Sequence, residues 1–150
     1  DATEAFLVAS RALVDVAARS LTEVDDVTLA QFRALVVLSR CEAVTIGELA
    51  DSLAVQPSTA TRLCDRLERK RLVRRFPGAS TDRRETALRL TTQGRRLVER
   101  VTARRRRDIA AITASMSPRD RLRAINGLAS FSRAAGELPP IDPFGWAGAK

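Results

Sequence analysis

The chain has 150 residues, of which 45% are hydrophobic and only 4% are aromatic, and its formal net charge at pH 7 is +8. This length suits one domain whose core needs no disulfide or metal, and many aliphatic residues with few aromatics favour packed helices over a β-sandwich. The sequence contains no His and no Tyr, which removes the commonest catalytic bases and metal ligands. We therefore predict that the protein is not an enzyme and that it uses no metal or cofactor.

The positive charge is segregated along the chain. Residues 1–50 contain four Arg and eight acidic residues, a net charge of −4, whereas residues 51–107 contain 17 basic and six acidic residues, a net charge of +11. Segregation of this kind predicts an anionic partner for the middle of the chain. The sequence has no apolar run long enough to span a membrane and no signal peptide, so we expect a cytoplasmic protein with reduced thiols.

The first two helices are predicted from apolar spacing and from a cap. Apolar residues of 2–21 recur at helical spacing and predict an amphipathic helix. Thr28 and Gln31 stand three residues apart in the pattern of a capping box, in which each side chain bonds to the backbone N–H of the other residue. This pattern predicts a second helix that starts after Thr28 and ends between residues 39 and 42.

The next two helices are short and close together. Thr45 and Glu48 repeat the capping-box pattern and predict a third helix. Pro57, in the segment AVQPS, ends that helix and suits the first position of a fourth helix, which we expect to reach residue 71. Two short helices joined by a turn of about four residues are typical of a helix-turn-helix.

Residues 72–76 and 86–90 are short segments that predict a two-stranded β-hairpin, because the loop PGASTDRRE between them has the residues of a hairpin connection. Leu88 and Leu90 are expected to face the core and Arg89 the solvent. A two-stranded hairpin that directly follows a helix-turn-helix is a wing.

Two longer helices are predicted after the wing. Thr91 caps a helix over 92–114, and the segment SPRD starts a helix over 118–136 with a Ser cap and a Pro in the first turn. The Pro- and Gly-rich tail 137–150 has no predicted regular structure. We expect residues 1–136 to form one domain that is mainly α, with six helices and a small two-stranded β wing.

Three segments at characteristic separations carry a resemblance to a known family. They are TIGELADSLAVQPSTATRLCDRLERKRLVRR, then DRR, which contains an Asp and an Arg separated by one residue, and then LRLTTQG, which leads into a long helix with Gly94 in its first turn. With these motifs the chain resembles the MarR family of winged-helix transcription regulators over residues 5–135.

The resemblance implies an intertwined homodimer in which the helices at about 2–21, 92–114 and 118–136 of both subunits interlock. A winged helix-turn-helix lobe at about 28–91 would then place its fourth helix in the major groove of double-stranded DNA and its wing along the minor groove. We expect the following residues at the dimer interface: Phe6, Leu13, Leu122, Ile125, Leu128 and Phe131.

The resemblance also implies a function. The expected protein is a repressor that binds a pseudo-palindromic operator and is released by a small lipophilic or phenolic ligand. Such a ligand would bind in a cleft between the dimerisation helices and the lobe, with Arg11, Arg19 or Arg33 nearby.

Physical chemistry also assigns DNA contacts to the fourth helix and to the wing. The N-terminal end of the fourth helix favours a phosphate, and Arg62 on its exposed side is our candidate for a bidentate contact to guanine. At the wing tip Arg84 is the candidate for the minor groove, and the resemblance suggests that Asp82 pairs with Arg62 or Arg83 and so positions the wing. The full set of predicted DNA-binding residues is Gln56, Pro57, Ser58, Thr59, Thr61, Arg62, Arg66, Arg83 and Arg84.

One residue departs from the family pattern. Arg71 stands where the family commonly has a Gly that ends the fourth helix in a left-handed conformation. We therefore expect either a strained left-handed Arg71, at a cost of about 1 kcal/mol, or a different helix cap.

Several alternatives stay open. In one alternative the winged helix is a protein-interaction module. In another its basic face binds nucleic acid without sequence preference. An RNA binder is disfavoured because the chain lacks an aromatic stacking platform. The run RRRR at 104–107 is either solvated and ion-paired or in contact with phosphate or ligand. Cys41 and Cys64 are either packing residues or a thiol switch.

Overall fold

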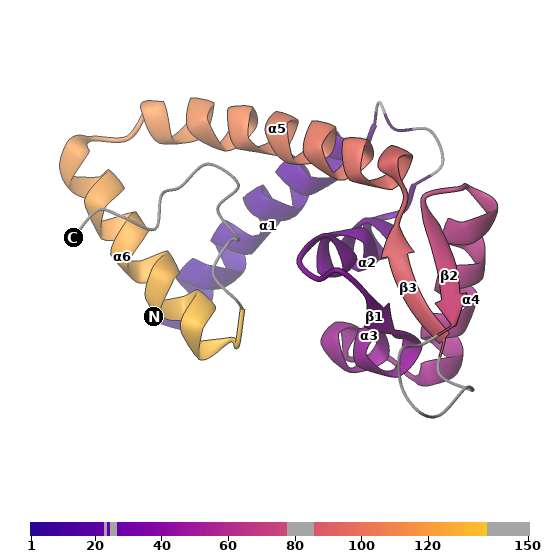
Figure 1. Ribbon diagram of the computed structural model, residues 1–150. Coiled ribbons are helices and arrows are strands. Elements are labelled where there is room, and N and C mark those ends of the chain that lie inside the picture. The colour runs from indigo at the N-terminus through magenta and orange to yellow at the C-terminus, as the bar shows by residue number, and fades with distance from the viewer. Residues whose placement is uncertain (23, 25–26, 78–85, 138–150) are drawn as a thin grey trace. The chain divides into compact units, whose positions relative to one another are not determined.

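The structure is a computed structural model that describes residues 1–22, 24, 27–77 and 86–137 (Figure 1). The chain divides into two compact units, residues 1–108 and 109–150. Six α-helices and three β-strands occur in the described residues: α1 (Ala2–Leu21), α2 (Leu29–Ser39), β1 (Val44–Thr45), α3 (Ile46–Leu53), α4 (Pro57–Arg69), β2 (Val73–Pro77), β3 (Thr86–Leu90), α5 (Thr92–Ala114) and α6 (Pro118–Ala134). The tip of the predicted wing and the tail from residue 138 lie outside the described residues.

Both predicted capping boxes are present. The Thr28 hydroxyl accepts a bond of 3.2 Å from the Gln31 N–H, and the Gln31 side-chain oxygen accepts one of 3.1 Å from the Thr28 N–H. Thr45 and Glu48 make the same pair of bonds at the start of α3. The Glu48 carboxylate accepts from the Thr45 N–H and from the Thr45 hydroxyl, both at 2.8 Å, and these two bonds lower the pKa of the carboxyl. Because each box satisfies two amides that the helix itself leaves unpaired, α2 and α3 begin where the sequence predicts.

The predicted two-stranded wing is present: β2 and β3 pair antiparallel, with Arg75 opposite Leu88. The sheet has a third strand that the sequence did not predict, because β1 pairs with the other edge of β3, with Val44 opposite Leu88. The short strand β1 extends the hairpin into the lobe and joins it to the start of α3 (Figure 1).

The core of the first unit lies between this sheet and helices α2, α3 and α4. Leu88 of β3 is completely buried there, as predicted, and Leu90 packs partly buried against the same cluster. The largest fully buried side chains are those of Phe32, Leu35, Leu49, Leu67, Leu88, Val16, Val73 and Val101. Since α2, α3, α4, β3 and α5 all contribute, the lobe and the first part of α5 share one hydrophobic core.

Helix α4 ends two residues earlier than predicted, in a Schellman motif. The Leu72 N–H donates to the Leu67 carbonyl at 3.0 Å, and the Arg71 N–H donates to the Glu68 carbonyl at 2.8 Å. Arg71 has a φ of 58°, so it takes the left-handed conformation that suits Gly. Of the two outcomes expected for Arg71, the structure has the strained residue with the usual cap.

The start of α5 is fixed against this turn. The Thr91 hydroxyl donates to the Arg71 carbonyl at 2.7 Å and accepts from the Gly94 N–H at 3.0 Å. A Cβ atom on Gly94 would lie 2.1 Å from the Leu72 carbonyl oxygen, so only Gly allows this close approach. The Gly in the LRLTTQG motif therefore allows the start of α5 to pack directly against the turn that follows α4.

The second unit is built around α6. The Ser117 hydroxyl caps the helix by accepting from the Asp120 N–H at 3.1 Å, and Pro118 occupies the first turn, as predicted. Arg121 donates to the carbonyls of Thr113 and Met116 at 3.1 and 3.3 Å, which secures the turn between α5 and α6. No residue of α6 is buried in its unit. Among the described residues no helix has the length and apolar character needed to cross a membrane.

Replacing Arg71 by Gly should stabilise the protein. Relief of the left-handed strain is worth roughly 1–2 kcal/mol, and the extra freedom of Gly in the unfolded chain offsets about 0.5–1 kcal/mol of it. We expect a net gain of about 0.5–1 kcal/mol in the free energy of unfolding, measured by urea denaturation.

The control is Arg100→Gly, since Arg100 is exposed within α5 and Gly costs about 1 kcal/mol inside a helix. If Arg71→Gly loses as much stability as this control, the inference that Arg71 is strained is wrong.

Candidate nucleic-acid interface

The N-terminal end of α4 is exposed and has no side-chain cap. Gln56 is the N-cap residue, and its side chain makes no capping bond, while Pro57 occupies the first turn. Pro57 has no N–H, and the Thr59 and Ala60 N–H groups donate to the Gln56 carbonyl at 2.9 and 3.1 Å. The Ser58 N–H and the positive end of the helix dipole are therefore what this end of the helix offers to an anion. Ser58 and Thr59 are exposed beside them. The hydroxyl of Thr61 donates to the Pro57 carbonyl at 2.9 Å, so its remaining capacity is that of an acceptor.

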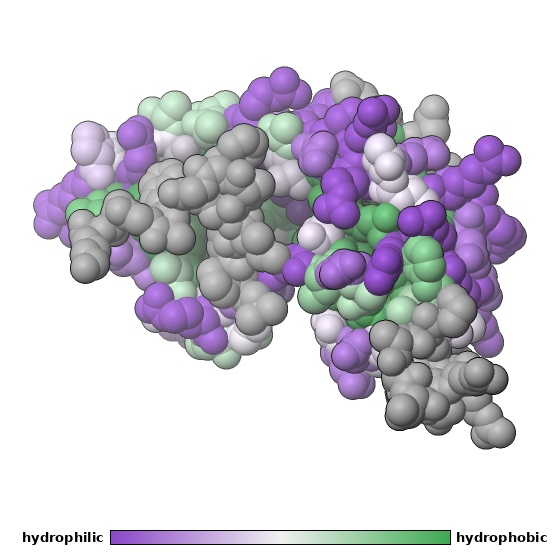
Figure 2. All heavy atoms as spheres, viewed as in Figure 1, coloured by the Kyte–Doolittle hydropathy of each residue, from purple (hydrophilic) through white to green (hydrophobic). Residues whose placement is uncertain are grey.

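Helix α4 has one buried side and one basic side. Ala60, Cys64 and Leu67 are completely buried against the core, whereas Arg62 and Arg66 are exposed. Figure 2 shows hydrophilic residues along the edge of the lobe that α4 forms. The structure thus brings together the α4 residues predicted from the sequence on one accessible face, Thr61 being partly buried at its border.

An ion-pair cluster that the sequence analysis missed holds β2 against α4. The Arg75 guanidinium donates to the Glu68 carboxylate at 2.7 Å and to the Asp65 carboxylate, and the Arg75 N–H donates to Glu68 at 3.3 Å. The hydrogen bond to Asp65, aided by the charge of Glu68, raises the pKa of Arg75 above its ordinary value. The available signal was Asp65 and Glu68, three residues apart on the helix that precedes a strand rich in Arg.

A second cluster lies along the hairpin strands. The guanidinium groups of Arg74 and Arg89 stand 4.5 and 4.8 Å from the centre of the Phe76 ring, and Arg89 lies 3.6 Å from the Glu42 carboxylate. Cation–π contacts of this kind fix the side chains across neighbouring strands. The wing-tip residues Asp82, Arg83 and Arg84 lie outside the described residues, so their predicted roles stay predictions.

The run of four Arg at 104–107 is divided by the fold. Arg106 and Arg107 are exposed, whereas Arg105 is partly buried, with its guanidinium 5.1 Å from the centre of the Phe32 ring and 3.4 Å from the Ser20 hydroxyl. Burial lowers the pKa of Arg105. At least Arg105 of this run therefore contributes to packing of the protein itself.

The two cysteines differ in environment. Cys41 is exposed, and Cys64 is completely buried on the core side of α4, where desolvation raises the pKa of its thiol to about 11. A thiol with this pKa is protonated and unreactive at neutral pH, which favours the packing interpretation of Cys64. In the part of the chain that is described, no three His, Cys, Asp or Glu residues lie together as a metal site.

Comparison with known proteins finds a matching family model and a related repressor. The family model of the MarR family matches residues 27–86. The chain is 33% identical over 113 residues to the HTH-type transcriptional repressor MdtR of Bacillus subtilis (strain 168), an alignment that covers 75% of this chain and 72% of the repressor.

Solved structures agree with this similarity. The crystal structure of RV1404 from Mycobacterium tuberculosis matches with a TM-score of 0.81 and 41% identity, covering 90% of this chain and 92% of that one. The structure of a MarR family protein from Bacillus stearothermophilus matches with a TM-score of 0.79 and 27% identity, covering 90% and 93% of the two chains.

Replacing Arg75 by Met should loosen β2 from α4. The Asp65 and Glu68 side chains are more than a third exposed, so screening limits the loss to about 1 kcal/mol in the free energy of unfolding. A double-mutant cycle with Glu68→Gln, followed by urea denaturation, should give a coupling energy of about 0.5–1 kcal/mol.

Arg33→Met serves as the control for the loss of one positive charge, because Arg33 is exposed on α2. A coupling energy of zero between positions 75 and 68 would mean that the ion-pair cluster does not hold the strand to the helix.

Proposed function

The chain belongs to the MarR family and is a transcriptional regulator, and we propose that it represses transcription as a homodimer bound to a pseudo-palindromic operator in double-stranded DNA. The exposed basic face of α4 is the observation that supports this proposal most directly. The alternative is a winged-helix module that binds proteins or binds nucleic acid without sequence preference.

The proposed mode of binding follows from the two sides of α4. Its buried side fixes the helix to the lobe, and its exposed N-terminal half carries Ser58, Thr59 and Arg62, which suit a major groove. Arg62 makes the bidentate contact to guanine O6 and N7 in this proposal, and the Ser58 N–H at the positive end of the helix dipole receives a phosphate. Arg84 enters the minor groove and Asp82 positions the wing, as the family resemblance suggests.

Exposed apolar side chains support the dimer. On α6, the exposed fractions of Leu122, Ile125, Leu128 and Phe131 run from 43% to 60%, and Leu13 of α1 is 46% exposed, while Phe6 is partly buried. Several large apolar side chains that share one helix and lie exposed to water indicate a surface that another molecule covers. We assign α1 and α6 to the interface with a second copy of this chain.

Release by a small molecule completes the proposal. A lipophilic or phenolic anion that binds better to a dimer with one separation of its two α4 helices would shift the population away from the DNA-binding separation. Arg11, Arg19 and Arg33 are exposed on α1 and α2 and are the candidate residues for such an anion. We expect the protein to act in the cytoplasm, where the DNA of its Bacillus subtilis relative lies.

Selection of bound sequences from a random duplex library tests the proposal. We expect a pseudo-palindrome whose half-site centres are about 10 base pairs apart, or a multiple of that spacing, because a two-fold dimer presents two α4 helices. Affinity should fall by roughly 0.9 log units per log unit of salt for each phosphate contact. Salt-sensitive binding without a consensus would favour the alternative module instead.

Replacing Arg62 by Ala should weaken binding to the selected operator by about 1–3 kcal/mol for each half-site, or about 2–6 kcal/mol for the dimer, and relax the preference at one base pair of each half-site. The same change at Arg84 should relax the A·T preference in the flanks instead. Fluorescence anisotropy with single-base variants of the operator measures both effects. Arg100→Ala, at an exposed position of α5, is the matched control. An unchanged consensus in Arg62→Ala would remove Arg62 from the base contacts.

Replacing Leu128 by Glu should dissociate the dimer, because it puts a charge into the proposed apolar interface. Size-exclusion chromatography with light scattering should show a dimer for the unaltered protein and a monomer for this variant. Ser130→Glu adds the same charge at another exposed position of α6. A mass of one chain for the unaltered protein would contradict the assignment of α6 to a dimer interface.

A further inference from the structure

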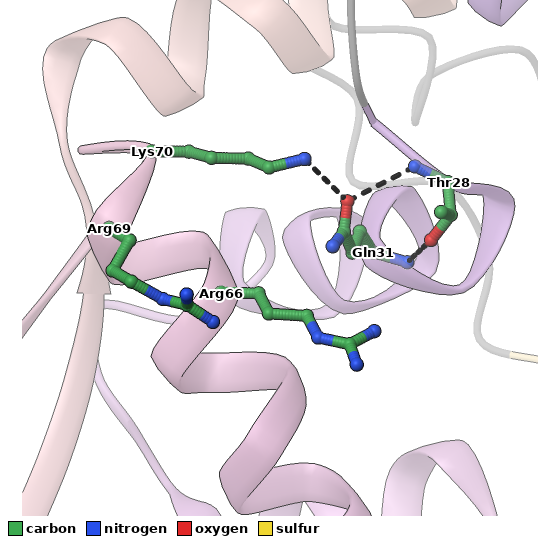
Figure 3. Close-up of a pocket in the computed structure, with 5 residues that line it drawn as sticks. All are labelled: Thr28, Gln31, Arg66, Arg69 and Lys70. Atoms are coloured by element: carbon green, nitrogen blue, oxygen red, sulfur yellow. Dashed lines mark hydrogen bonds between the residues drawn. The ribbon is translucent and has the colours of Figure 1, made fainter.

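A surface pocket lies at a place that the proposed major-groove contact does not use. Its volume is about 420 Å³, and it lies between the C-terminal half of α4 and the N-terminal end of α2 (Figure 3). The side chains of Arg66 and Lys70 extend from α4 toward α2, where Gln31 and Thr28 form the opposite side (Figure 3). The lining residues are Thr28, Gln31, Arg66, Arg69 and Lys70.

The residues that line the pocket make it positively charged. Three of its five lining residues are cations, and none of the five carries a negative charge. The positive end of the α2 dipole adds to this potential, because Thr28 is the N-cap of that helix. The Lys70 ammonium donates to the Gln31 side-chain oxygen at 3.2 Å, and the same oxygen accepts from the Thr28 N–H. These bonds hold the two sides of the pocket together.

The two guanidinium groups keep most of their donors. The Arg69 Nε atom donates to the Asp65 carbonyl at 3.4 Å, which leaves the terminal nitrogens of that side chain available. The Arg66 guanidinium has no hydrogen bond or ion pair with the residues that the structure describes, and it is exposed. Guanidinium groups match phosphate oxygens by paired N–H bonds, so two of them beside one pocket suit an oxyanion.

The lining does not suit a lipophilic ligand. Sites for small organic molecules are lined mainly by apolar and aromatic side chains, whereas all five residues here are polar or charged. The exposure of Arg66 and Arg69 leaves the pocket open to a large partner. These features favour a phosphate group that is part of a polymer.

The positions of the basic residues along α4 indicate that this polymer is DNA. Arg62, Arg66 and Arg69 follow one another at intervals of four and three residues, so they share one face of the helix. Seven residues of helix rise about 10 Å, which is close to the 12 Å width of the major groove. With Arg62 at the bases, Arg69 therefore reaches the sugar-phosphate backbone that borders the groove.

We propose that the pocket lined by Thr28, Gln31, Arg66, Arg69 and Lys70 is a phosphate subsite that binds one backbone phosphate of the DNA at the border of the groove read by α4. This inference rests on the proposed DNA-binding function. It assigns Arg66 and Arg69 to sequence-independent affinity and leaves the choice of bases to Arg62.

The test compares Arg69→Gln with the unaltered protein on the selected operator and on a mixed-sequence duplex. Each subunit loses one phosphate contact, which makes two for the dimer, so binding to both duplexes should weaken by the same factor and the salt slope should fall by about 1.8. The loss should therefore be about 12-fold larger at 50 mM than at 200 mM salt. Arg69→Lys should retain most of the slope, because it retains the charge.

The matched control is Arg100→Gln. It removes the same charge from an exposed residue of α5 that does not line the pocket. Equal effects of Arg69→Gln and Arg100→Gln would overturn the phosphate subsite, because they would show only a change in overall charge. A changed base preference in Arg69→Gln would overturn it as well.

A duplex with one neutral methylphosphonate linkage, moved along the operator, locates the contact. One position in each half-site should weaken binding of the unaltered protein and have no further effect on Arg69→Gln, since the contact is already absent. The absence of such a position would overturn the subsite while operator binding stands. Failure of the unaltered protein to prefer any operator would overturn the proposed function separately, and the mixed-sequence duplex would still test the subsite.

Discussion

The packing of one side of α4 is the constraint on which the other features depend. Ala60, Cys64 and Leu67 are completely buried, and small side chains at the first two positions let the helix lie close to the core. With that side fixed, Arg62, Arg66 and Arg69 must face outward, and Asp65 and Glu68 must face β2. The basic face and the ion-pair cluster that fixes the hairpin are thus two consequences of the same packed surface.

The turn after α4 extends this rigidity to α5. Arg71 accepts a left-handed conformation, and its carbonyl accepts the Thr91 hydroxyl, while Gly94 lets α5 approach the Leu72 carbonyl. Helix α4, the hairpin and the start of α5 therefore meet at this turn. Direct hydrogen bonds, rather than a loose linker, connect the first turn of α5 to the end of α4. In the proposed function these bonds would carry a displacement of α5 to α4.

Local signals in the sequence predicted the features that depend on near neighbours. Both capping boxes, the Pro at the start of α4 and the Ser cap of α6 were found because each involves residues within four positions. Strand β1 was missed because it has two residues and pairs with a strand more than 40 positions away. The basic pocket was missed for the same reason, since Lys70 and Gln31 are 39 positions apart and meet only after the lobe has folded. The cluster around Arg75 spans seven to ten positions and was missed because it joins a helix to the strand that follows the turn.

The central claim is that α4 reads the floor of the major groove while its C-terminal half holds the backbone. Methylation interference at guanine N7 on a selected duplex tests it directly, because N7 is an acceptor in the major groove and the methyl group blocks it. We predict interference at a guanine in each half-site, with the two guanines related by the symmetry of the site. Binding that tolerates methylation at every guanine would show that the protein holds only the backbone, and would contradict this account.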